Sequence, residues 1–405
     1  MSAKILIVGG GFAGISAATE LFNQKQNGAD IDVVMVDKSH ASIFAPLLPD
    51  LISGRIRSSS VMYPLRPFCR RLGFQFRQTC VRSISDNPPA IKTENNRIET
   101  DFLILSFGCE TNYFGQDKWT QKTIGLKTVE EGHQIREKLL RRIEKWKSDK
   151  GTSSGNIVVV GGGYTGFEIA GQIVRLLRMA SGPKIGNSNG AARVLIVEKA
   201  AKPLRNVSES VRNWAIALMQ SLGIEVKTGT TIESIEDQNA TLTDGESLDN
   251  PLVIWTPGVR PGPAAKSLDI PTTKGQRLKV ESSLKLEGCD RIYAAGDLAG
   301  PTPAGRENPL RMSVQFSVLG GRHAAENIIR QICGEALQAF EPFDPGYVLP
   351  LAPGWGTGKI LGKSFYGRLP YIFHYLLCVA KSWGWANRCQ VAGDILQSPA
   401  RVIRQ

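Results

Sequence analysis

Two segments of the chain repeat the same order of apolar and polar positions about 150 residues apart. Each begins with a short apolar run, ILIV at 5–8 and IVVV at 157–160, which is typical of a strand buried on both faces. A glycine-rich turn, a stretch with helical spacing and a second apolar strand ending in an acidic residue follow in both segments. The pattern predicts two strand–turn–helix–strand units and an α/β fold with parallel strands.

Both glycine-rich turns have the GxGxxG spacing. The glycines are Gly9, Gly11 and Gly14 in the first unit and Gly161, Gly163 and Gly166 in the second. The first glycine of this motif permits the tight turn, the second lets a pyrophosphate approach the backbone, and the third lets the helix pack on the strand. Asp37 and Glu198 end the second strands, where a carboxylate hydrogen-bonds a ribose diol. Two complete units therefore predict that the chain binds two dinucleotides.

The acidic residue of the second unit bears on which nicotinamide dinucleotide binds there. A carboxylate repels a phosphate on the ribose, so Glu198 favours NADH over NADPH. Lys199 follows it directly and weakens this argument.

The segments around the two units predict the domain organisation. We expect a proline-marked loop leading into a helix at 44–56, a buried strand and glycine turn at 101–115, an amphipathic helix at 127–146, strand-and-turn segments at 252–262 and 291–300, a Ser/Gly-rich linker at 150–156 and an insertion at 181–192. The first domain is then discontinuous, with the second inserted into it. We divide the chain into 1–118 and 263–332 for the first nucleotide-binding domain, 119–262 for the second, and 333–405 for a C-terminal region.

The C-terminal region has a different composition. Tyr371, Phe373, Tyr375, Trp383 and Trp385 lie among leucine and isoleucine, with Arg368, Lys381 and Arg388 around them. An aromatic helix with basic ends over 366–388 suits the interface of an anionic bilayer. The alternative is a helix that packs on the body of the protein or across a dimer interface.

Composition excludes several functional classes. The formal net charge of +12 favours anionic partners, but no basic run interleaved with aromatics indicates a nucleic-acid platform. Seven cysteines without a CxxC or CxxxxC pair indicate a reducing compartment and leave no redox disulfide. Cysteines and histidines form no metal-ligand pattern, no apolar stretch reaches 18 residues, and the first strand starts too early for a signal peptide.

In order along the chain, these segments resemble the pyridine nucleotide–disulfide oxidoreductase superfamily and, within it, type II NADH dehydrogenases. FAPLLPDLISG resembles that family's loop after the first acidic residue. SFGCETNYFG and WTPGVRP are similar to its two ATG-like turns, and AAGDLA to the segment that holds FAD through an aspartate, here Asp297. The resemblance implies two Rossmann-like domains, one for FAD and one for NADH, and a C-terminal α-helical region that associates with the membrane or forms a dimer.

The motifs and the resemblance together give the expected cofactor-binding residues: Gly9, Gly11, Phe12, Ala13, Gly14, Asp37, Lys38, Gly108, Gly161, Gly163, Tyr164, Gly166, Glu198, Gly258, Gly296, Asp297 and Gln315. No metal is expected.

Two catalytic positions are implied by the resemblance. Glu168 stands where the family has a glutamate near nicotinamide and flavin, and a carboxyl there can relay protons to a quinone. The alternative is an acidic residue that only favours the helix dipole. Gln315 matches the first glutamine of the family's quinone-pocket signature.

The chain departs from the family pattern in the acceptor region. Leu319 replaces the second glutamine of the quinone-pocket signature, and Ser317 an alanine. Ala352 and Pro353 stand where a later signature has a charged pair. These departures leave the identity of the acceptor open.

The resemblance implies a peripheral enzyme at the cytoplasmic face of the cell membrane that passes electrons from NADH through FAD to a quinone without pumping protons. A homodimer is possible. Three alternatives remain: a soluble reductase for a small iron–sulfur or other protein, a sulfide:quinone oxidoreductase-like enzyme, and a redox-sensing protein that binds both nucleotides without efficient turnover.

Overall fold

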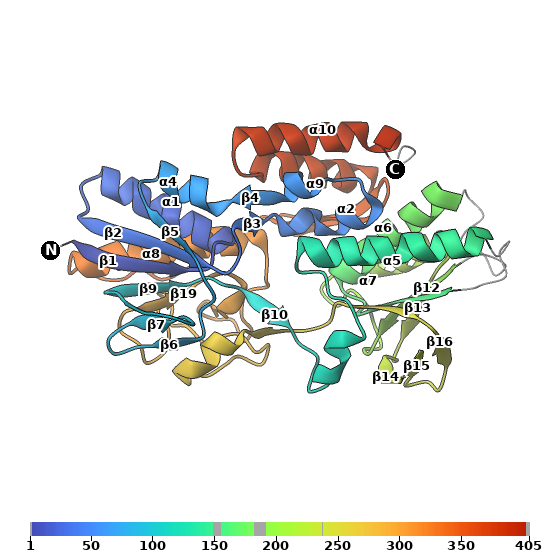
Figure 1. Ribbon diagram of the computed structural model, residues 1–405, viewed down its shortest axis with the longest axis horizontal. Helices are drawn as coiled ribbons and strands as arrows, with labels where there is room; N and C mark the ends of the chain where they lie inside the picture. The colour runs from blue at the N-terminus through green and yellow to red at the C-terminus, as the bar shows by residue number, and fades with distance from the viewer. Residues whose placement is uncertain (1, 149–154, 182–191, 237, 402–405) are drawn as a thin grey trace. The chain divides into compact units, whose positions relative to one another are not determined.

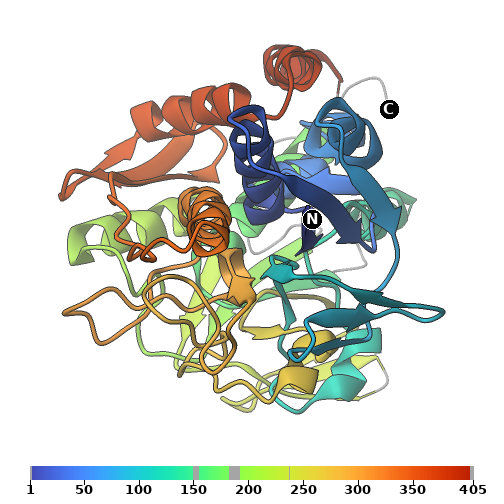
Figure 2. The same ribbon diagram turned by 90° about the vertical axis from the view of Figure 1, so that its left-hand side faces the viewer.

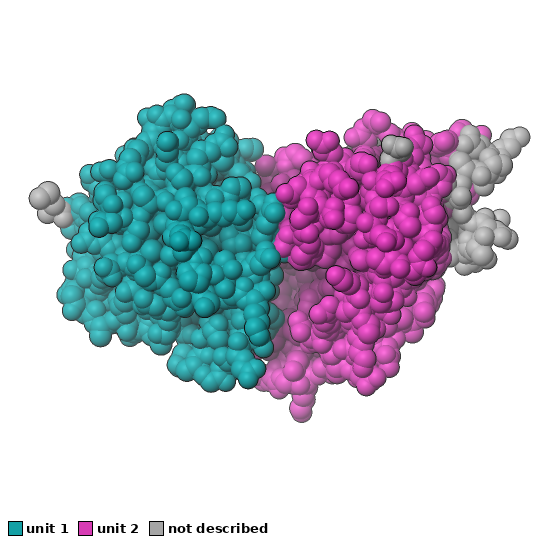
Figure 3. Space-filling view, turned by 90° about the horizontal axis from the view of Figure 1, so that it is seen from below, with its two compact units in different colours: residues 1–42, 63–110, 259–343 teal, residues 43–62, 111–258, 344–405 magenta. Residues whose placement is uncertain are grey.

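The computed structural model describes residues 2–148, 155–181, 192–236 and 238–401, which fall into two compact units (Figures 1 and 3). Unit 1 consists of Met1–Ser42, Tyr63–Glu110 and Val259–Phe343. Unit 2 consists of Ile43–Met62, Thr111–Gly258 and Asp344–Gln405. The predicted linker and insertion lie largely outside the described residues.

Unit 1 is built on a parallel five-stranded sheet with the order β19-β9-β1-β2-β5. Its strands are β1 (Ala3–Val8), β2 (Ile31–Asp37), β5 (Gln75–Gln78), β9 (Phe102–Leu105) and β19 (Ile292–Ala294). Helix α1 (Phe12–Gln26) follows β1 and packs along α8 (Val314–Ile332). The approach is close, because a Cβ on Gly321 would lie 2.0 Å from the Ala13 carbonyl oxygen.

Unit 2 repeats this plan with a parallel four-stranded sheet in the order β13-β12-β11-β17. Its strands are β11 (Gly155–Val160), β12 (Ala192–Glu198), β13 (Ile224–Thr228) and β17 (Leu252–Trp255). Helix α6 (Tyr164–Ser181) follows β11, and α5 (Val129–Ser148) packs on α6. In each sheet the strand that leads into the glycine turn is central: β1 lies between β2 and β9, and β11 lies between β12 and β17. The strand order reverses at this central strand, and in open α/β sheets such a switch point is where dinucleotides bind.

The predicted α/β fold with two Rossmann-like units is confirmed. The smaller elements are β3 (Ala41–Ile43), η1 (Ala45–Leu47), α2 (Leu48–Ser53), α3 (Ser58–Val61), β4 (Met62–Pro64), α4 (Leu65–Arg71), β6 (Ser83–Ser85), β7 (Ala90–Lys92), β8 (Arg97–Glu99), β10 (Cys109–Thr111), η2 (Asp117–Gln121), α7 (Glu209–Ser221), β14 (Ile232–Glu236), β15 (Asn239–Leu242), β16 (Ser247–Asp249), β18 (Val259–Pro261), η3 (Pro263–Leu268) and η4 (Gly296–Leu298).

The C-terminal part of unit 2 contains strands that the sequence analysis did not anticipate. The strands β20 (Gly346–Ala352), β21 (Trp355–Ile360) and β22 (Lys363–Gly367) form an antiparallel sheet. Helix α9 (Arg368–Lys381) covers one face of this sheet, and α10 (Trp385–Arg401) packs on α9 (Figures 1 and 2). The single helix expected over 366–388 is therefore divided. The backbone leaves the helix at Ser382, and Gly384 takes a φ of +74°.

In the part of the chain that the structure describes, no helix has both the length and the apolar composition needed to cross a bilayer. All seven cysteines are free thiols.

Candidate functional site

The glycine turn of unit 1 is held by two side chains that come from neighbouring strands. The Asp37 carboxylate, at the end of β2, accepts a hydrogen bond from the Gly10 N–H at 2.6 Å and another from the Ser39 N–H at 2.7 Å. The Ser106 hydroxyl, just after β9, donates to the Gly9 carbonyl at 2.8 Å. Gly9 has a φ of +109°, a region that side chains with a Cβ rarely adopt.

The glycine turn of unit 2 is held in the same way. The Glu198 carboxylate, at the end of β12, accepts from the Gly162 N–H at 2.7 Å and from the Ala200 N–H at 2.9 Å. The Thr256 hydroxyl, just after β17, donates to the Val160 carbonyl at 2.7 Å. The two turns are therefore structural equivalents, with Asp37 matching Glu198 and Ser106 matching Thr256.

The space around the glycines fits a bound pyrophosphate. In each turn a Cβ on the third glycine would clash with the first glycine. On Gly14 it would lie 1.8 Å from the Gly9 oxygen, and on Gly166 it would lie 2.0 Å from the Gly161 oxygen. A Cβ on the second glycine, Gly163, would meet no protein atom within 4 Å, and one on Gly11 only a carbonyl at 4.0 Å. The third glycines thus serve packing, while the second leave open space where a phosphate can reach the backbone.

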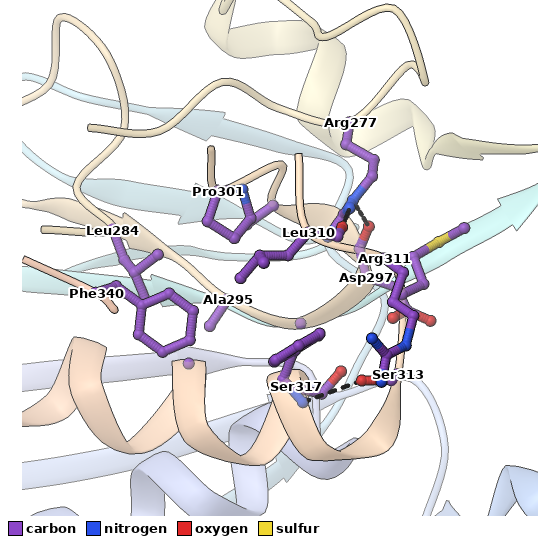
Figure 4. Close-up of a pocket in the computed structure, with 15 residues that line it drawn as sticks. Arg277, Leu284, Ala295, Asp297, Pro301, Leu310, Arg311, Ser313, Ser317 and Phe340 are labelled. Atoms are coloured by element: carbon purple, nitrogen blue, oxygen red, sulfur yellow. Dashed lines mark hydrogen bonds between the residues drawn. The ribbon is translucent and has the colours of Figure 1, made fainter. Parts of the chain in front are cut away.

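A second segment of unit 1 approaches the start of α1. Gly296 and Asp297 form the short helix η4 directly after β19, and Gly296 lies against Ala13 and Ser317. The Arg277 guanidinium donates to the carbonyls of Asp297, at 3.1 Å, and Leu310, which fixes this turn (Figure 4). Burial lowers the pKa of Arg277, and the negative charge of Asp297 opposes that shift. The arrangement fits the expected role of Asp297 in holding FAD.

The other expected residues of unit 1 lie on the same elements. Phe12, Ala13 and Gly14 form the first turn of α1, and Lys38 is exposed directly after Asp37. Gly108 has a φ of +68° in the turn after β9. Gln315 lies in the first turn of α8, where its amide donates to the Phe343 carbonyl at 3.2 Å.

The glycine turn of unit 2 opens on a cavity of about 630 Å³. The expected residues Gly161, Gly163, Tyr164, Glu198 and Gly258 all line it. Aromatic rings form another part of the wall: Tyr113, Phe114, Trp119 and Trp255. A cavity of this size, with a phosphate-binding turn and aromatic walls, suits a dinucleotide.

Glu168 does not line this large cavity. It lies one turn further along α6 and lines a small cavity of about 10 Å³ with Asp50 and Gln172, a volume that matches roughly one water molecule. Asp50 is buried and accepts hydrogen bonds from the Gln172 amide at 2.9 Å and the Tyr375 hydroxyl at 2.8 Å. The Arg55 guanidinium lies over the Tyr375 ring, 3.8 Å from its centroid.

Burial shifts the pKa of both carboxyls in this cluster, but their neighbours act on them in opposite directions. Burial raises the pKa of Glu168 well above its usual value, and the negative charge of Asp50 raises it further. Burial also raises the pKa of Asp50, but the Arg55 cation and the hydroxyl of Tyr375 oppose the shift. The negative charge of Asp50 and the donors around it therefore favour the proton on Glu168 rather than on Asp50.

Several residues that the structure places at these sites were not expected from the sequence: Asp50, Arg55, Ser106, Gln172, Arg205, Thr256, Arg277 and Tyr375. Ser106 and Thr256 could have been found by aligning the two units, since each lies two residues before an expected glycine, Gly108 or Gly258. The Asp50 cluster had no local signal, because Tyr375 lies 325 residues further along the chain.

Glu168→Gln should raise the melting temperature relative to the native protein, and the difference should grow between pH 5 and pH 8. The unfolded state loses the Glu168 proton near its ordinary pKa, while the folded state keeps it to higher pH. The native protein therefore loses about 1.4 kcal/mol of stability for each unit of raised pKa as pH rises through this window. Glutamine does not titrate. Thermal unfolding across this range tests the prediction.

The exposed Glu137 on α5 supplies the control, and Glu137→Gln should give a difference that changes little with pH. A Glu168→Gln difference that stays constant or shrinks with rising pH would show that Glu168 is ionised in the folded protein.

The chain is similar to known proteins over most of its length. Residues 3–318 match the model of the family described as pyridine nucleotide-disulphide oxidoreductase. A type II NADH:quinone oxidoreductase from Staphylococcus haemolyticus is 28% identical over 379 residues, which cover 90% of this chain and 91% of the relative.

Two solved structures share the fold. NDH2 from Plasmodium falciparum in complex with NADH superposes with a TM-score of 0.84 at 17% identity and covers 99% of both chains. The sulfide:quinone oxidoreductase of Aquifex aeolicus gives a TM-score of 0.75 at 14% identity and covers 96% of this chain and 92% of its own. The family model spans both units, and this chain belongs to the pyridine nucleotide-disulphide oxidoreductase family.

Proposed function

We propose that this chain is a type II NADH:quinone oxidoreductase that passes electrons from NADH through FAD to a quinone without pumping protons. The observation that carries the proposal is the pair of equivalent glycine turns, one in each unit, each held by an acidic residue. The name of the relative from Staphylococcus haemolyticus, which aligns over nine-tenths of both chains, supports the reaction.

In this proposal each of the two nucleotide-binding domains expected from the sequence holds one cofactor. Residues 1–118 and 263–332 hold FAD through the turn at Gly9–Gly14, Asp37 and Asp297. Residues 119–262 hold NADH through the turn at Gly161–Gly166 and Glu198. The chemistry that FAD supplies when bound is hydride acceptance from NADH and delivery of two electrons to the acceptor. The protein binds, orients and supplies protons.

Reduction of a quinone to a quinol consumes two protons, and Glu168 is the proposed donor of one. Burial and the negative charge of Asp50 raise its pKa above that of an ordinary glutamate, which favours the protonated form that a proton donor needs. Asp50, Gln172 and Tyr375 hold the surrounding network in place. Gln315 is proposed to contact the quinone. Leu319, which replaces a glutamine, packs against the apolar cluster of Leu284, Leu310, Phe316 and Phe340.

Stopped-flow spectroscopy of the flavin absorbance tests this function. NADH mixed anaerobically with the FAD-loaded protein should bleach the flavin quickly, and a short-chain quinone should restore the absorbance quickly. Glu168→Gln should slow the second step, on the order of a hundredfold, and leave the first nearly unchanged, because only quinone reduction needs the proton. The slowing should be greatest at high pH, where water is the poorer proton source.

Each rival function gives a different result. Fast bleaching by NADH with slow recovery from quinone, but fast recovery from an acidic iron–sulfur protein, would replace the quinone with a protein acceptor. Bleaching by sulfide would indicate the sulfide:quinone reaction. Fast bleaching followed by a persistent complex with NAD⁺ would indicate a redox sensor.

The outer face of α9 is the proposed membrane contact. Leu369, Ile372, Phe373 and Leu376 recur at helical spacing and are 76%, 53%, 46% and 60% exposed. The inner face of the same helix is buried through His374, Tyr375 and Cys378, so the apolar stripe lies on the exposed side of the helix. Arg368 and Lys381 lie at the two ends of α9. An apolar stripe between basic residues suits the interface of an anionic bilayer.

We also propose a location for the protein at the cell membrane. Residues 333–405 would contact the lipid, and seven free cysteines favour the cytoplasmic face of the cell membrane.

Leu369→Glu/Leu376→Glu should weaken binding to phosphatidylglycerol vesicles by about tenfold or more, because two exposed leucines can no longer insert into the bilayer. Vesicle co-sedimentation measures the loss. Val318→Glu/Ile332→Glu, which adds the same charge on exposed positions of α8, should bind almost like the native protein. Equal losses of vesicle binding in both variants would show that the added negative charge, and not the loss of the leucines, weakens binding. Unchanged vesicle binding with a dimer converted to monomer would assign the stripe to a homodimer.

A further inference from the structure

The charged side chains that line the cavity of unit 2 include two cations near the ribose-binding carboxylate. Among the described residues that line it, the charged side chains are Glu198, Lys199 and Arg205. With two cations and one carboxylate, these three side chains carry a net formal charge of +1 at neutral pH. The ribose diol of NADH brings no charge to this place, whereas the 2′-phosphate of NADPH brings about two negative charges.

Arg205 lies on a loop that is fixed against the glycine turn. The N–H of Leu204 donates to the Gly162 carbonyl at 2.8 Å. From α7, the Arg212 guanidinium donates to the carbonyls of Pro203, at 2.8 Å, and Val207, at 3.2 Å. Leu204 is held at a φ of +46°, a strained conformation for leucine that the surrounding contacts impose. The loop therefore presents Arg205 at a defined place beside Glu198.

The Glu198 carboxylate and the Arg205 guanidinium differ in how firmly they are held. Both carboxylate oxygens accept backbone N–H groups, from Gly162 and Ala200, and the side chain is 15% exposed. The guanidinium lies 3.4 Å from the carboxylate and is 69% exposed. An exposed ion pair of this kind contributes little to stability, so turning Arg205 toward a ligand costs little.

We propose that this chain oxidises NADPH as well as NADH, and that Arg205, assisted by Lys199, binds the 2′-phosphate. The inference rests on the proposed function and adds a second electron donor to it. A guanidinium forms paired, charge-assisted hydrogen bonds with a phosphate. The two cations offset the repulsion from Glu198, which alone would exclude the phosphate. With NADH bound, Glu198 is available to the ribose diol and Arg205 returns to solvent.

Calorimetric titration of the FAD-loaded protein with NAD⁺ and NADP⁺ tests the proposal without any acceptor. The native protein should bind NADP⁺ with an affinity within about tenfold of that for NAD⁺. Arg205→Ala should weaken NADP⁺ binding by about tenfold or more, the worth of a charged hydrogen bond, and change NAD⁺ binding less than about twofold. Added salt should weaken NADP⁺ binding more than NAD⁺ binding.

Lys202→Ala is the matched control, because Lys202 is an exposed cation of the same loop that does not line the cavity. It should leave both affinities nearly unchanged. Bleaching of the flavin by NADPH under anaerobic conditions, slowed by Arg205→Ala, is the second expected result.

The proposal is overturned if the native protein binds NADP⁺ more than about a thousandfold more weakly than NAD⁺. It is also overturned if Arg205→Ala weakens both nucleotides equally, or if Lys202→Ala acts like Arg205→Ala. Failure of quinone to restore the flavin absorbance would contradict the proposed function and leave these binding results standing.

Discussion

In both units, a carboxylate at the end of one strand accepts a hydrogen bond from a backbone N–H in the glycine turn of the strand beside it. Asp37 holds Gly10 at 2.6 Å and Glu198 holds Gly162 at 2.7 Å. A charged acceptor makes a strong hydrogen bond with a backbone donor, and here it fixes a turn that has no regular secondary structure of its own. The open space beside Gly11 and Gly163 depends on this fixed backbone.

The C-terminal segment depends on a second buried carboxylate. Asp50 joins α2, α6 and α9, since Gln172 and Tyr375 both donate to it and Arg55 lies over the Tyr375 ring. A buried charge is tolerated only where several donors converge on it. Burial raises the pKa of Glu168 and the negative charge of Asp50 raises it further, so the contact that anchors α9 also favours a protonated carboxyl in α6. The outer stripe of α9 and the chemistry of Glu168 are thus connected through one network.

The sequence could predict the turns and the sheets because their causes are local. Only glycine readily takes the φ of +109° at Gly9, and continuous apolar runs identify strands buried on both faces. The strands β20–β22 were missed because GYVLPLA and WGTGKI do not alternate, and their packing is set by a distant contact. A Cβ on Gly171 of α6 would lie 2.3 Å from the Leu351 carbonyl. Arg205 was missed for a similar reason: its place beside Glu198 follows from the return of the loop to Gly162.

We infer that the two equivalent turns bind two different dinucleotides at the same time. The most direct measurement is the stoichiometry of FAD released from the purified protein, together with equilibrium dialysis of NAD⁺ against the same sample. We expect one FAD and one NAD⁺ per chain, with no displacement of FAD by saturating NAD⁺. Two FAD per chain, or loss of FAD as NAD⁺ binds, would contradict it.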